Sequence, residues 1–143
     1  MRDYLNMDMT EREALGVSEL GLAYVGDAVY ELMTRTRLCD EGCTTARNMH
    51  TAAVERVSAG AQAAAARRVL PELTESERAV YKRGRNTRVH SMARGASQTE
   101  YHMSTGLEAL FGYLYLRGER ARLGELFELA FAGGAGELIM NNE

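Results

Sequence analysis

The chain has 143 residues, of which 45% are apolar and only one is proline, and its formal net charge at pH 7 is −3. This length suffices for one domain with a substantial core, and the composition favours a mostly helical protein. We expect no signal peptide and no membrane span, because no stretch approaches the roughly 18 consecutive apolar residues that a spanning helix needs. Two cysteines, Cys39 and Cys43, are too few for a disulfide framework, which favours a cytoplasmic location.

The N-terminal half of the chain predicts two helices. Ser18 is a candidate N-cap for the first helix, which runs to about Leu38. The region of Gly42 turns the chain. Either Thr44 or Thr45 can cap the second helix, in which apolar residues recur at three- and four-residue spacing.

The sequence also marks where this second helix ends and the next one starts. Residues 58–60, Ser-Ala-Gly, bend or divide the second helix, and the Leu-Pro pair at 70–71 ends it. Thr74 and Glu77 have the spacing of a capping box, so a helix begins there, and we expect it to fray at Gly84.

The C-terminal part predicts a loop followed by two helices. Residues 87–100 are mostly Ser, Gly, Arg, Gln and Thr without periodicity, which is typical of a loop. A helix that contains Glu108 follows and stops at Gly118. The last helix covers residues 119–132 and ends at the two glycines that come next. Because no alternating strand pattern is present, we expect an all-α helical bundle.

Isolated acids lie in two otherwise apolar segments. Residues 20–33 are apolar, aromatic or small except for Asp27 and Glu31. Glu108 is the only acid in residues 101–116. A segment that is apolar nearly all round is expected in the core. A buried carboxylate must be paired, protonated or bound to a metal. We therefore expect these acids to be buried and to have a specific role.

Small residues accompany both acids. Gly26 precedes Asp27, and two glycines and an alanine lie within four residues of Glu108. Small residues let two helices approach closely, so the two carboxylates could meet across the contact and share a divalent cation. The alternative interpretation is that each acid pairs with a buried arginine or accepts backbone amide hydrogen bonds.

The charge is unevenly distributed along the chain. Between residues 78 and 99 there are six basic residues and no acid, which leaves 11 basic and 20 acidic residues elsewhere. The six residues, which we call the basic stripe, are Arg78, Lys82, Arg83, Arg85, Arg88 and Arg94. A basic stripe in an otherwise acidic chain indicates placed phosphate contacts, with a solvated helix face as the alternative.

Five segments, taken in order, resemble the ribonuclease III family. Residues 22–29, Leu-Ala-Tyr-Val-Gly-Asp-Ala-Val, resemble the signature helix of its catalytic domain, and residues 108–116 resemble its second acidic motif. The remaining segments resemble the small bacterial branch called mini-ribonuclease III; they are His50 with residues 57–63, residues 82–86 and residues 101–106.

The resemblance implies a single ribonuclease III-type catalytic domain, residues 1–143 with a core at about 18–132, that forms a homodimer. It implies an endoribonuclease that cuts double-stranded RNA with Mg²⁺, or Mn²⁺ in its place, and leaves a 5′-phosphate and a 3′-hydroxyl. The substrate it implies is the precursor of 23S ribosomal RNA. Asp27 and Glu108 match catalytic, metal-binding acids of the family, whereas Ala23 and Thr105 stand where two further acids would be.

The resemblance also assigns two surfaces. Without a separate RNA-binding domain, the catalytic domain itself must bind RNA, and we expect the contacts from Lys82, Arg83, Arg85, Asn86, Arg88 and Arg94. The apolar face around Leu20, Tyr24 and Val25 belongs to the signature helix and is expected at the dimer interface.

Several interpretations stay open at this point. One is a non-catalytic RNA-binding or ribosome-associated module on the same fold, and another is an unrelated helical protein whose acids are structural. Cys39 and Cys43 with His50 could suggest zinc, although a fourth ligand is missing. Glu31 either assists the metal site through water or pairs with an arginine.

Overall fold

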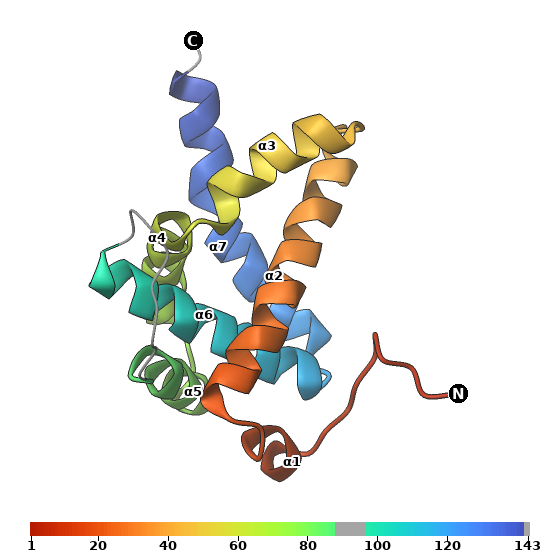
Figure 1. Ribbon diagram of the computed structural model, residues 1–143, viewed down its shortest axis with the longest axis vertical. Coiled ribbons are helices and arrows are strands. Elements are labelled where there is room, and N and C mark those ends of the chain that lie inside the picture. Colours follow the sequence, from red (N-terminus) through yellow and green to blue (C-terminus); the bar gives the residue numbers. More distant parts are fainter. Residues whose placement is uncertain (88–96, 142–143) are drawn as a thin grey trace.

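The computed structural model describes residues 1–87 and 97–141, with side chains described as far as residue 132. Over these residues the chain forms α-helices and no strand, which confirms the predicted all-α fold (Figure 1). The helices are α1 Glu11–Leu15, α2 Glu19–Asp40, α3 Ala46–Val57, α4 Ala59–Val69, a 3-10 turn η1 Leu70–Glu72, α5 Glu75–Arg85, α6 Gln98–Leu116 and α7 Arg120–Asn141. None of the helices in the described ranges is long and apolar enough to cross a bilayer.

Hydroxyl side chains fix where most of the helices begin. The side-chain oxygens of Ser18, Thr45 and Thr74 accept hydrogen bonds from backbone amides in the first turns of α2, α3 and α5, as predicted. Ser97 and Glu100 form a further capping box that starts α6. The predicted loop, which extended to residue 100, is therefore too long, because its polar composition hid this capping signal.

Ser58 divides the second predicted helix into α3 and α4, in agreement with the expected bend or division at residues 58–60, because its backbone is extended and its hydroxyl caps α4. Two other predicted boundaries differ from the structure. α5 continues past Gly84 to Arg85 instead of fraying. The backbone of α7 stays helical to Asn141, so the predicted end at residues 133–134 is wrong. Glycine lowers helix propensity by about 1 kcal/mol per residue but does not forbid a helix.

Two glycines make the turns that the sequence predicted. Gly42 has a φ of 98° and follows α2, and Gly118 has a φ of 73° and separates α6 from α7. Both values lie in the left-handed region, which residues other than glycine rarely adopt. The turn geometry therefore explains why glycine occupies both positions.

α6 is the central helix of the bundle. α2, α4, α5 and α7 all pack against it, and α1, at the lower end of the bundle in Figure 1, also contacts it. The side chains of Leu107, Leu110, Phe111 and Leu114 are almost completely buried between these helices. The core therefore surrounds α6, and residues on this helix are held by contacts on several sides.

α2 and α6 cross with their backbones in contact at Gly26 and Gly112. A Cβ atom at Gly26 would lie 1.6 Å from the carbonyl oxygen of Glu108, and one at Gly112 would lie 2.0 Å from that of Leu22. These distances leave no room for any side chain at either position. The close approach of the two helices, predicted from the small residues, is confirmed.

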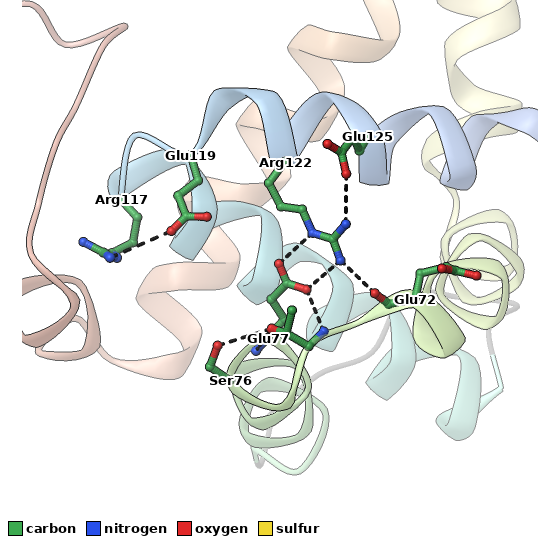
Figure 2. Close-up of polar contacts among 8 residues, drawn as sticks. Glu72, Ser76, Glu77, Arg117, Glu119, Arg122 and Glu125 are labelled. Carbon is green, nitrogen blue, oxygen red and sulfur yellow. Dashed lines mark hydrogen bonds and ion pairs between the residues drawn. The ribbon is translucent and has the colours of Figure 1, made fainter.

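A buried ion pair fastens the start of α5 to α7. Figure 2 shows Arg122 of α7 reaching Glu77, whose side chain is 7% exposed. The Nε and Nη2 atoms of Arg122 donate to the two carboxylate oxygens of Glu77 at 2.8 and 2.9 Å, and Nη2 also donates to the carbonyl oxygen of Glu72. The Arg122 guanidinium, with help from the Thr74 amide, holds the pKa of Glu77 below its ordinary value.

We expect Glu77→Gln to lower the free energy of unfolding at pH 7 by about 3 kcal/mol, because the variant leaves a partly buried arginine without its counter-charge. The folded-state pKa of Glu77 is depressed, so its contribution is complete above about pH 4.3 and is lost as the pH falls through the folded-state value. The difference between variant and wild type should therefore narrow in acid. Denaturant unfolding at pH 7 and at pH 3 measures it.

The matched control is Glu125→Gln, which removes an exposed carboxylate from the same arginine. An exposed ion pair of this kind contributes about 1 kcal/mol or less. Equal effects of the two variants at pH 7 would contradict the structural role given to Glu77.

Candidate active site

The crossing of α2 and α6 brings Asp27 and Glu108 together. Asp27 follows Gly26, the residue in backbone contact with α6, and Glu108 lies one turn before Gly112 on the facing helix. The carboxyl groups of the two acids come within hydrogen-bonding range of each other. The structure thus places side by side two acids that are 81 positions apart in the sequence, as the spacing of small residues predicted.

The two acids are less buried than the sequence predicted. Asp27 is exposed and Glu108 is half-buried. The expectation failed because α2 is apolar on two sides, only one of which faces the core: Leu20, Tyr24 and Leu32 are 44%, 81% and 56% exposed. The carboxylates consequently lie at a seam between helices that an ion or a substrate can reach.

The electrostatic environment of Glu108 disfavours its charged form. Burial, together with the hydrogen bond and the negative charge of Asp27, raises the pKa of Glu108 to about 9, and the amide of Gln62 acts in the opposite direction. Among the described residues, neither acid forms an ion pair with a basic side chain. The alternative in which buried arginines neutralise the two acids therefore does not hold for the arginines that the structure describes. A bound cation would relieve the repulsion between them.

The donor set suits a hard divalent cation that keeps much of its water. Asp27 and Glu108 offer carboxylate oxygens, which Mg²⁺ prefers. The side chain of Ala23 is buried and has no atom that could bind a metal ion. The hydroxyl of Thr105 donates a hydrogen bond to the carbonyl oxygen of Tyr101 at 3.0 Å. Within the described ranges, no three His, Cys, Asp or Glu side chains converge on one point. The protein thus provides two carboxylates here, and water would fill most of the coordination shell.

The zinc interpretation is not supported. Cys39, Cys43 and His50 all lie in the described part of the chain, and they do not converge on a common point. The Sγ atom of Cys39 instead contacts the Sδ atom of Met49 at 3.4 Å, between the end of α2 and the start of α3. Both cysteines are free thiols.

The structure clarifies the role of two polar residues near the acids. Glu31 forms an ion pair with Arg35 on the same face of α2, which is one of the two roles that the sequence left open. Gln62 of α4 was not singled out from the sequence, yet its amide lies beside the carboxyl group of Glu108. The only sequence signal was one polar residue within a run of alanines.

The end of α5 carries the part of the basic stripe that reaches solvent. Lys82, Arg83 and Asn86 are exposed, and Arg85 is half-buried with its guanidinium 6.0 Å from the ring centre of Tyr81. In the described part of the chain none of these cations has a carboxylate partner. Their charge is thus available to an anionic ligand.

The other members of the basic stripe differ from these. Arg78 is half-buried, and its Nη2 atom donates to the carbonyl oxygen of Leu70 at 2.9 Å, so it serves to join α5 to the end of α4. Arg88 and Arg94, both expected to bind RNA, lie outside the described residues.

Comparisons with known proteins agree on one family. Residues 20–119 match the model of the ribonuclease III domain. The chain is 45% identical over 116 residues to the mini-ribonuclease 3 of Symbiobacterium thermophilum, which covers 81% of this chain and 89% of that protein. It is 40% identical over 131 residues to the mini-ribonuclease 3 of Clostridium tetani, with 90% and 87% covered.

The fold is also found in a solved structure. A crystal structure of a protein from Fusobacterium nucleatum superposes with a TM-score of 0.75 at 25% sequence identity, covering 83% of this chain and 97% of that one. The family model, the relatives and the solved fold all agree. The chain therefore belongs to the ribonuclease III family, in its mini-ribonuclease III branch.

Proposed function

We propose that this chain cleaves double-stranded RNA with a Mg²⁺ ion held by Asp27 and Glu108. As a member of its family it is a double-strand-specific endoribonuclease. One observation carries the metal proposal: the two carboxyl groups meet at a solvent-accessible seam, and no basic side chain of the described residues neutralises them. A non-catalytic module would gain nothing from this repulsion, which disfavours that alternative.

The residues of the chain contribute position and charge to the reaction. The backbone contact between α2 and α6 fixes the spacing of Asp27 and Glu108, so the carboxylates need little rearrangement to bind a cation. When bound, the ion lowers the pKa of a coordinated water and stabilises charge on a phosphoryl oxygen. Hydrolysis of the phosphodiester then leaves a 5′-phosphate and a 3′-hydroxyl.

The exposed end of α5 is the proposed RNA contact. Duplex RNA is recognised mainly through its shape, its phosphates and its 2′-hydroxyls, which suits cationic side chains at a helix end. Lys82, Arg83, Arg85 and Asn86 lie there, and Arg88 and Arg94 follow in sequence. From the family resemblance we infer that the substrate is the 23S ribosomal RNA precursor, and this inference leads to a cytoplasmic location.

The outer face of α2 supports the proposed homodimer. Leu20, Tyr24, Ala28 and Leu32 recur every four residues and are all exposed, so they form one apolar stripe along the helix. α2 lies at an edge of the bundle (Figure 1). Val25, which was predicted to share this face, is half-buried and packs against the core instead. A second copy related by a two-fold axis would cover the stripe.

We expect Asp27→Asn to lower the rate of duplex RNA cleavage in Mg²⁺ by more than about 100-fold, because even outer-shell partners of a metal contribute about 10- to 100-fold. The change is isosteric, so circular dichroism and RNA binding should stay near wild type. The control is Glu31→Gln, which alters a neighbouring acid that already has an arginine partner. Cleavage by Asp27→Asn at the wild-type rate would show that the proposed metal site is wrong.

The dimer is tested with Tyr24→Asp. Light scattering at micromolar concentration should give twice the chain mass of 15.8 kDa for the wild type and the monomer mass for the variant, because a charge in the apolar stripe must be buried on association. Tyr4→Asp alters a similarly exposed tyrosine outside this face and should remain dimeric. A monomeric wild type, or a variant that still dimerises, would refute the interface.

The RNA contact is tested by the double substitution Arg83→Ala with Arg85→Ala. Each phosphate neutralised adds about 0.7–0.9 to the dependence of log K on log salt, so the slope should fall by roughly 1–2 and all duplexes should bind more weakly. Arg120→Ala, an exposed arginine at the start of α7, is the control. If the double variant kept the wild-type salt slope, the end of α5 would be only a solvated surface.

A further inference from the structure

Gln62 is a buried amide in an otherwise apolar helix face. It is 3% exposed, and the other buried residues of α4 are three alanines and a valine, Ala63, Ala65, Ala66 and Val69. A buried amide without hydrogen-bond partners is costly, so a polar group at such a position requires an explanation. Packing alone would be served equally well by an apolar residue of the same length.

The neighbour of this amide is the carboxyl group of Glu108. Glu108 thus has two polar neighbours, Asp27 from α2 and Gln62 from α4, and both of these helices pack against α6. The amide group can donate hydrogen bonds to a carboxylate oxygen, whereas Asp27 can only compete with Glu108 for a proton or a cation. In agreement with this, Gln62 lowers the pKa of Glu108 while burial and Asp27 raise it.

α4 holds Gln62 in a fixed position. The hydroxyl of Ser58 caps the start of the helix, one turn before Gln62. Near its other end, the guanidinium of Arg68 donates to the carbonyl oxygens of Leu129 and Ala130 on α7. Because α4 is capped at its start, joined to α7 near its end and packed against α6, the amide approaches Glu108 from a helix of the core rather than from a loop.

We propose that Gln62 is a positioning residue for the metal site, whose side-chain amide holds the Glu108 carboxylate in the orientation in which it and Asp27 present oxygens to one divalent cation. This inference rests on the proposed function and adds a third residue to it. Carboxylates that bind metals are themselves usually hydrogen-bonded, and these outer partners tune both orientation and affinity. In a site with only two carboxylates, loss of one orientation should weaken binding strongly.

The test is Gln62→Met, which keeps the length and the unbranched shape of the side chain but removes its hydrogen-bond donors. Mn²⁺ binding to the metal-free protein, without RNA, is followed by electron paramagnetic resonance. We expect the Mn²⁺ affinity to fall about 10- to 100-fold. Binding of duplex RNA in EDTA should be unchanged, because Gln62 is buried and the proposed RNA contact at the end of α5 consists of other residues.

Thr34→Val is the matched control, since it removes another buried polar group, one that donates only to the carbonyl oxygen of Tyr30. It should alter stability and leave Mn²⁺ affinity at the wild-type value. If Gln62→Met likewise changed stability alone, Gln62 would be structural and the proposal would be overturned.

Two further variants keep the result decisive. If Gln62→Met does not fold, Gln62→Asn retains an amide but withdraws it by one methylene, and an Mn²⁺ affinity equal to wild type in that variant also overturns the proposal. Asp27→Asn separates this inference from the proposed function. Loss of Mn²⁺ binding in Asp27→Asn with normal binding in Gln62→Met refutes only the role of Gln62, whereas normal binding in both refutes the metal site itself.

Discussion

The contact between Gly26 and Gly112 is the constraint on which the candidate site depends. Two helices with ordinary side chains at their crossing lie about 8–10 Å apart, and acids beside such a crossing would be held away from each other. Here a Cβ atom on either glycine would overlap the backbone of the opposite helix. The site is therefore formed by the packing of two long helices, one of which is the central helix α6.

Two glutamates of this chain show how the fold treats structural and functional acids differently. Glu77 has a bidentate arginine partner and a capping role, and its pKa is lowered. Glu108 has another acid as its neighbour, and its pKa is raised to about 9. The first arrangement stabilises the fold, whereas the second destabilises the metal-free protein, as expected of the proposed metal site.

The arginines show a similar division. Arg68, Arg78 and Arg122 donate to backbone carbonyl oxygens and tie helices together, while Arg83 reaches solvent. A simple count of positive charge along the chain does not separate these two groups. The separation depends on which side chains meet a carbonyl oxygen in the folded protein, so Arg78 was placed in the basic stripe although its main contact is structural.

Local signals in the sequence predicted much of the fold. The caps at Ser18 and Thr74 and the turn at Gly118 depend on residues close in sequence, and the structure has all three. The meeting of Asp27 and Glu108 was also predictable, because the small residues beside them permit a close crossing. The family assignment needed the order of several motifs and not any one of them.

Other features depend on the tertiary structure and could not be predicted in the same way. The exposure of Asp27 depends on α2 being apolar on a side that no other helix of this chain covers in the described residues. The role of Gln62 depends on which residue of α6 lies opposite α4. The end of α7 was misplaced because two glycines suggest a stop without enforcing one.

The most direct measurement is thermal unfolding of the wild type and Glu108→Gln at pH 8.5, in EDTA and in Mg²⁺. Because its folded-state pKa is raised, the Glu108 carboxyl group makes the metal-free wild type progressively less stable as the pH rises from about 4.3 towards 9. The account predicts that Glu108→Gln melts at a higher temperature than wild type in EDTA, and that Mg²⁺ raises the melting temperature of the wild type only. A variant less stable than wild type in EDTA, or an equal effect of Mg²⁺ on both proteins, would contradict it.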